Sequence, residues 1–145
     1  MFIRQDEVRP DDQYYWVTQN EDGSYTATPK ELEDREEVDQ DGNPMYVQVL
    51  DKTDPENPVM VNSTERLVHK GLKSQRIAQV KQNANITLSH TDWVVIRKAE
   101  RNVDIPADVA TYRAAVVAWA QSTEAAITAV TTVEELKAIN MGVSI

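Results

Sequence analysis

The stretch LSHTDWVVIR, residues 88–97, is the most informative part of this chain, together with Ile105-Pro106 and Tyr112-Arg113 downstream. Read in order, these residues predict a helix start, a helix, a proline-marked turn and a second helix. One aromatic residue stands near each helix entrance, and no catalytic constellation accompanies them. The pattern is typical of a packing unit, and it favours a protein that acts by holding another protein.

Helices are also predicted on the N-terminal side of this stretch. Asn62, with Glu65 three residues later, matches a capping box and predicts a helix over residues 64–81. A second capping box at Ser89 and Asp92 predicts the next helix. The segment between these two helices is rich in asparagine and is expected to break the first of them.

The third predicted helix is the longest, and it opens at Pro106, where proline is tolerated in the first turn. Its apolar residues repeat at heptad spacing. They are Val109, Tyr112, Val116, Trp119, Thr123, Ala126 and Val130. We expect this seam to form a core between helices, with an oligomer or partner surface as the alternative. Thr131 with Glu134 predicts a short last helix that ends near Ile139.

The N-terminal part predicts β structure. Residues 14–18 are aromatic and β-branched, the turn Asp22-Gly23 follows, and a further strand is expected over residues 45–50. The fold class is therefore predicted as α+β. An acidic antiparallel β-meander over residues 1–61 precedes a C-terminal helical bundle over residues 62–145, with three main helices and a short fourth.

Charge divides the chain in the same way. Residues 1–62 hold 16 acids and 5 bases, whereas residues 63–145 hold 8 acids and 10 bases, which gives the net charge of -9. An acidic half repels DNA and anionic lipid, and no apolar run is long enough to cross a bilayer, so neither nucleic acid nor a membrane is an expected partner.

Residue types also exclude several kinds of chemistry. The chain has no cysteine, so disulfides, thiolate metal sites and cysteine nucleophiles are excluded. Its two histidines, His69 and His90, lack the spacing of a zinc site. No catalytic residue, cofactor or metal is therefore predicted.

One segment carries a family resemblance. Its elements are Arg76, Leu88, Thr91-Asp92-Trp93, Arg97, Ile105-Pro106 and Tyr112-Arg113-Ala114. Through them, residues 76–119 resemble tail-associated proteins of bacteriophages, including tail-fibre assembly chaperones. The segment covers about a third of the chain and departs from the family pattern at Asn102, where a glycine is expected.

The resemblance implies a non-enzymatic viral structural or assembly protein. Such a protein would bind a tail or tail-fibre polypeptide, in the host cytoplasm during virion assembly or in the virion tail. It would either leave after assembly, as a chaperone, or stay as an adaptor or cap, and a homo-oligomer is a further alternative.

Six residues are predicted to bind the partner. They are Trp93, Arg97, Tyr112, Arg113, Val116 and Trp119. The aromatic residues and the valine would be apolar anchors, or the core that orients them, and the arginines would make polar contacts at the rim. Two other functions stay open: a small hydrolase-like enzyme that uses paired carboxylates, and a nucleic-acid-binding regulator that uses the basic helix 64–81.

Overall fold

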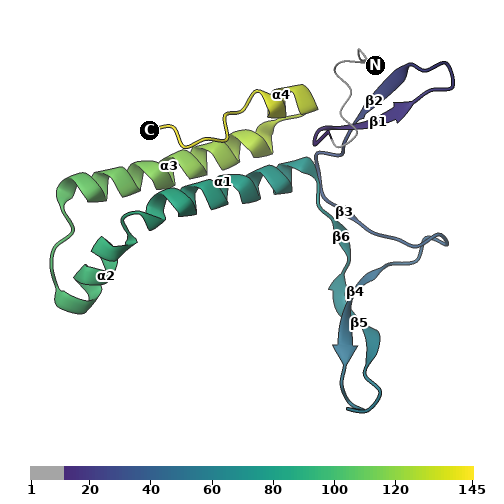
Figure 1. The fold of residues 1–145 in the computed structure, drawn as a ribbon, viewed down its shortest axis with the longest axis horizontal. Coiled ribbons are helices and arrows are strands. Elements are labelled where there is room, and N and C mark those ends of the chain that lie inside the picture. Colours follow the sequence, from purple (N-terminus) through teal and green to yellow (C-terminus); the bar gives the residue numbers. More distant parts are fainter. Residues whose placement is uncertain (1–11) are drawn as a thin grey trace.

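The computed structural model describes residues 12–145, in which antiparallel strands are followed by helices (Figure 1). The predicted α+β class is confirmed. The strands are β1 (Tyr15–Gln19), β2 (Tyr25–Pro29), β3 (Arg35–Glu36), β4 (Tyr46–Asp51), β5 (Val59–Arg66) and β6 (Val68–His69). The helices are α1 (Leu72–Ser89), α2 (Asp92–Arg101), α3 (Ala107–Ala129) and α4 (Val133–Lys137). Within residues 12–145 the strands form three separate two-stranded sheets and no continuous meander.

The first hairpin joins β1 to β2 in the predicted place. Its turn has Gly23 at a φ of 84°, a conformation that favours glycine. One face of the hairpin packs on the helical part, because Tyr15 and Ala27 are buried in the same core as the helices. The Tyr15 hydroxyl donates a 2.6 Å hydrogen bond to Glu134 of α4. The β and helical parts therefore share one core.

This hydrogen bond predicts a specific loss of stability at high pH. The bond to Glu134 and burial raise the pKa of Tyr15 to about 12, above the value near 10 of an unfolded tyrosine. Above the lower value the unfolded chain loses a proton that the folded chain keeps, so the free energy of unfolding falls as pH rises toward the higher value. We expect Tyr15→Phe to remove this part of the pH dependence, measured by urea unfolding at increasing pH. Equal slopes for both proteins would contradict the assignment.

A branched β arm follows the first hairpin. β3 pairs with β6 at its base, a small hairpin closed at Gly42 leaves on one side, and β4 pairs with β5 in a long ribbon. Arg66 holds the junction, because its guanidinium lies 3.1 Å from the Glu36 carboxylate and donates to the carbonyls of Met45 and Glu37. The ribbon then extends away from the helices (Figure 1).

Helix α1 begins where the segment 31–34 covers its N-terminus. The amides of Leu72 and Lys73 donate to the carbonyls of Glu31 and Leu32, at 2.9 and 3.1 Å. Asp34 accepts from the Gly71 amide at 2.8 Å and from the Ser74 hydroxyl at 2.7 Å. These two hydrogen bonds lower the pKa of Asp34, as expected for a carboxylate that caps a helix.

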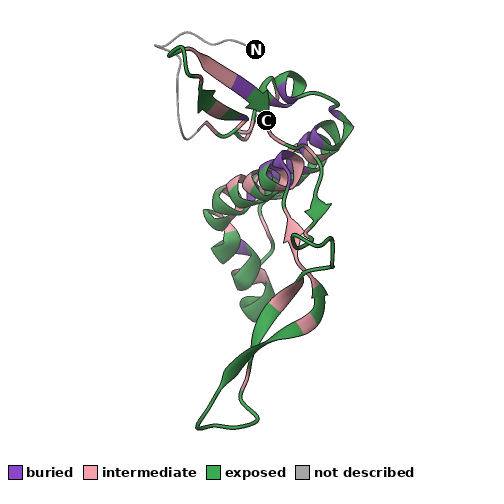
Figure 2. Cartoon of the chain, turned by 90° about the vertical axis from the view of Figure 1, so that its right-hand side faces the viewer, coloured by how far each residue is buried: buried purple, intermediate pink, exposed green. Residues whose placement is uncertain are grey.

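The long helices α1 and α3 lie side by side and antiparallel (Figure 1). Their buried side chains form the core with α4 and the C-terminal tail, and Figure 2 shows buried residues along this pair. The largest fully buried members include Leu72, Val80, Val116, Ile127 and Leu136. α2 leaves the pair at its far end and buries one residue, Val94.

Three sequence predictions for the helices are wrong. No helix begins near Asn62: residues 62–66 belong to β5, and the predicted boundary between residues 61 and 62 lies inside this strand. The asparagine-rich segment 83–85 does not break the first helix, which continues to Ser89. The Ser89–Asp92 capping box is absent, since the Ser89 hydroxyl donates to the carbonyl of Ile86 and α2 follows Thr91.

The third and fourth helices agree better with the sequence. α3 begins directly after Pro106, as predicted. α4 is capped one residue later than expected, because the Thr132 hydroxyl accepts from the Glu135 amide. The predicted heptad seam is partly correct: Val116, Thr123 and Val130 are buried. The remaining buried positions of α3 are Ala120 and Ile127. Each lies one residue after a predicted seam position, Trp119 or Ala126.

Candidate partner-binding surface

The Thr91-Asp92-Trp93 element lies at the turn between α1 and α2. Arg113 of α3 reaches this turn and donates to the Leu88 carbonyl at 2.9 Å and to the Thr91 hydroxyl at 2.8 Å. It also lies 3.0 Å from the Asp92 carboxylate. One guanidinium therefore donates to a carbonyl at the end of α1 and also holds the start of α2. The Asp92 carboxylate lies at the N-terminus of α2, where the helix dipole favours a negative charge.

This geometry gives Arg113 a structural role. The prediction placed it at the rim of a partner site, but its Nη1 donors are used inside the chain and its side chain is only 22 % exposed. Because it fixes where α2 leaves the helical pair, Arg113 positions the residues on α2.

Trp93 and Ile96 are the most exposed apolar residues that Arg113 positions. Their exposed fractions are 58 % and 54 %, which is unusual for side chains of this size on one short helix. The Arg97 guanidinium lies 5.0 Å from the centre of the Trp93 ring, a distance typical of a cation–π contact. Arg97 Nε is buried and has no hydrogen-bond partner among the residues that the structure describes.

Other exposed apolar side chains lie on the elements next to α2. We define the distal apolar surface as the exposed large apolar residues of the α1 end, α2, the following loop and the first half of α3. They are Ile86, Trp93, Val95, Ile96, Val103, Tyr112 and Val117. All seven are exposed and belong to the elements at the far end of the helical pair.

Apart from Arg113, the predicted site residues divide into two groups. Trp93 and Tyr112 are exposed and Arg97 lies against Trp93, so these three are accessible to a partner. Val116 is fully buried and Trp119 packs against the core, so they act as the core that orients the surface. Sequence reasoning missed Ile96, because apolar residues on short helices usually face a core, and it missed Val103, which lies in the loop after α2 and belongs to no periodic pattern.

The basic face predicted for residues 64–81 does not form. Arg66 lies in the β arm, and Lys70 and Lys73 lie within 4 Å of Asp34 and Glu33. Arg76 is 7 % exposed, with its guanidinium 4.7 Å from the centre of the Tyr14 ring. The helical row of cations on which a nucleic-acid contact would depend is therefore dispersed.

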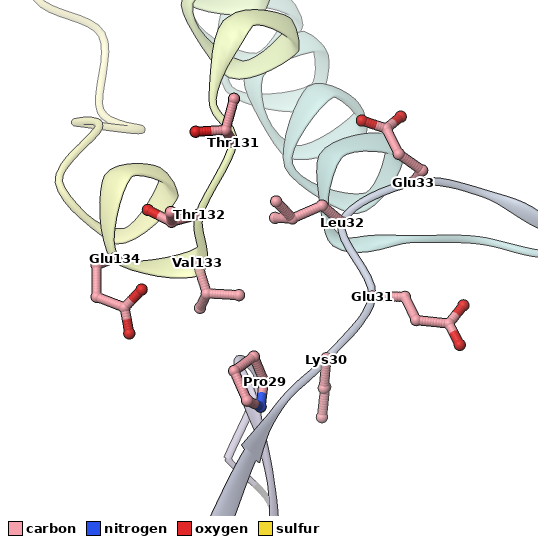
Figure 3. A pocket seen from close by; sticks show the side chains of 9 residues that line it. All are labelled: Pro29, Lys30, Glu31, Leu32, Glu33, Thr131, Thr132, Val133 and Glu134. Atoms are coloured by element: carbon pink, nitrogen blue, oxygen red, sulfur yellow. The ribbon is translucent and has the colours of Figure 1, made fainter. Parts of the chain in front are cut away.

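A shallow hollow of about 540 Å³ lies between the segments 29–33 and 131–134. Figure 3 shows Leu32 and Val133 turned toward it, while the Glu31, Glu33 and Glu134 side chains point away. Glu31 forms an ion pair with Arg35, and Glu33 forms one with Lys73. Glu134 accepts a hydrogen bond from the Tyr15 hydroxyl. The hollow thus presents no paired free carboxylates for hydrolysis.

Two general findings concern the described residues as a whole. Within residues 12–145, no group of three or more His, Cys, Asp or Glu side chains is close enough to hold a metal ion. No helix in this part of the chain has the length and apolar character required to cross a membrane.

The chain was also compared with protein-family models, with curated proteins and with solved structures, and none of them matches it.

Proposed function

We propose that this protein binds a tail or tail-fibre polypeptide of a bacteriophage, without enzymatic activity, through the distal apolar surface. The class of partner comes from the resemblance of residues 76–119 to tail-associated proteins. The way of binding is supported by one observation above others: Trp93 is 58 % exposed on a helix that Arg113 holds in place.

A large aromatic residue at a rigid, solvent-exposed position is what a binding hot spot requires. Tryptophan and tyrosine contribute large contact areas, and little entropy is lost when their supporting helix is already ordered. Trp93, Ile96 and Tyr112 are the proposed anchors, and Arg97 provides a cation beside the indole ring. An apolar surface of this kind would cover hydrophobic parts of a fibre polypeptide before its assembly is complete.

Mass spectrometry of purified particles, together with co-purification of fibre proteins from infected cells, tests the proposal. Detection in mature particles would identify a resident adaptor or cap. Detection only in lysate, bound to fibre protein, would identify an assembly chaperone. If the protein is found in neither fraction, the proposal is wrong.

The residue-level prediction is that Trp93→Ser weakens binding of the co-purified fibre protein about 30-fold, which corresponds to about 2 kcal/mol. Thermal unfolding should change little, because the lost side chain is largely exposed. Affinity is measured by isothermal titration calorimetry. Ile145→Ser is the matched control, since Ile145 has a similar exposed fraction but lies outside the distal apolar surface, and it should bind as the wild type does. Unchanged affinity for Trp93→Ser would remove the distal apolar surface from the proposal.

A further inference from the structure

Each face of the β4–β5 ribbon carries an exposed pair of apolar side chains. Its register pairs Leu50 with Met60, and the next positions along the strands pair Val49 with Val61. Because successive side chains of a strand point to opposite faces, the first pair lies on one face and the second pair on the other. All four side chains are exposed, and Figure 2 shows the arm as largely exposed along its length.

Nothing in the described chain covers these faces. Each strand pairs only with the other, and the ribbon extends away from the helices (Figure 1). An isolated two-stranded ribbon is marginally stable in water, and it is normally completed by a third strand or by packing on a helix. The exposed valine, leucine and methionine side chains therefore indicate a ribbon that a further polypeptide completes.

The free edge of β4 is the accessible one for an added strand. Natural edge strands are usually protected by lysine, proline or a bulge. In β5 the register shift leaves extra residues between Asn62 and Arg66, and Pro58 precedes the strand. β4 has no proline and no lysine between Tyr46 and Asp51, and its register with β5 is continuous from Gln48 to Asp51. The outward N–H and C=O groups of this part of β4 therefore offer a regular template.

Charge indicates which polypeptide fits. Residues 46–66 contain four acids (Asp51, Asp54, Glu56 and Glu65) and two bases (Lys52 and Arg66). Arg66 is already engaged with Glu36, so the acids exceed the free bases around the ribbon. A second copy of this chain would bring the same excess of negative charge, whereas a strand with basic ends would be attracted.

We propose that β4 accepts an added strand from a partner polypeptide whose strand is apolar at alternate positions and basic at its ends. The partner's identity as a fibre polypeptide rests on the proposed function, but the chemistry of the added strand does not. The ribbon would thereby become a three-stranded sheet, with main-chain hydrogen bonds along β4 and apolar contacts to the exposed side chains on each face.

Amide exchange measured by NMR on the full chain tests this proposal. The probe is the synthetic peptide acetyl-Lys-Val-Thr-Val-Thr-Val-Lys-amide, and its twin has glutamate in place of both lysines. We expect the lysine peptide to slow exchange of amides in residues 46–51 and to bind about tenfold more tightly than the twin at low salt. Absence of protection with the lysine peptide, or equal binding of both peptides, would overturn the proposal.

Two variants locate the contact. Val49→Lys places a charge on the ribbon and should abolish protection by the lysine peptide. Val38→Lys is the matched control, since Val38 has similar exposure but lies in the small side hairpin, and it should keep the protection. Retained protection in Val49→Lys would contradict the ribbon as the site. Protection that appears without peptide, together with a dimer in sedimentation, would assign the edge to a second copy and overturn the proposal.

The outcomes also separate this inference from the proposed function. If the peptide binds but no fibre protein is captured, the strand-accepting edge stands and the fibre partner is wrong. If fibre protein binds through Trp93 while the peptide leaves β4 unprotected, the inference about the ribbon is wrong and the proposed function stands.

Discussion

Gly71→Ala is expected to lower the free energy of unfolding by about 3 kcal/mol, which is near the upper end for an overpacked site. A Cβ atom on Gly71 would clash with the carbonyl oxygens of Leu32 and Glu33. Both are backbone atoms, so no side-chain rotation relieves the contact, and the segment 31–34 must move away from α1. That movement also lengthens the hydrogen bonds from the Leu72 and Lys73 amides that start the helix.

Urea unfolding of the full chain measures this effect, with Gly142→Ala as the control. A Cβ on Gly142 would meet only a side-chain oxygen, Asn140 Oδ1, at 3.4 Å, so the control should change stability by less than about 0.5 kcal/mol. If the two variants unfold at the same urea concentration, the segment 31–34 does not cover the start of α1 as described.

The start of α1 also explains why residues 62–71 were predicted incorrectly, whereas residues 72–81 are helical as predicted. Asn62 and Glu65 have the spacing of a capping box, but they lie in β5, where Asn62 pairs with Gln48 of β4. The actual cap of α1 comes from Asp34, which is 37 residues before Gly71 in the sequence. A partner so distant has no local signature, so tertiary contact overrides the local pattern.

Local signals did predict the elements that depend on neighbouring residues. The hairpin at Asp22-Gly23 and the start of α3 after Pro106 follow from the backbone preferences of glycine and proline. The arm could not be predicted in the same way. Its junction depends on Arg66, which contacts two separate segments, at Glu36-Glu37 and at Met45, and gives no periodic pattern in the sequence.

Sequence spacing predicted only part of the candidate surface. Heptad spacing identifies a buried stripe, but it does not say which aromatic residues lie outside that stripe. Trp93 follows the helix start at Thr91 and turns outward, because Val94 is the residue of α2 that packs inward. The role of Arg113 depends on the approach of α3 to the α1–α2 turn, which sequence spacing alone does not give.

The second large effect is expected at Ile127. Its side chain is fully buried in the core between α1, α3 and the C-terminal segment, so Ile127→Ala should lower the free energy of unfolding by about 3–4 kcal/mol. The lost methyl and methylene groups account for part of this value, and the cavity they leave accounts for the rest. Denaturant unfolding followed by circular dichroism measures the change, since the helices would report the loss directly.

The neighbouring residue provides a control that separates the two possible seams of α3. Heptad spacing predicted Ala126 as a seam position, but Ala126 is exposed and Ile127 is buried. Ala126→Ser should therefore change stability by less than about 0.5 kcal/mol, as is usual for an exposed helix position. A large loss for Ala126→Ser with a small one for Ile127→Ala would mean that α3 is rotated by one residue from the described packing. The distal apolar surface would then turn with it, because Tyr112 and Val117 lie on the same helix.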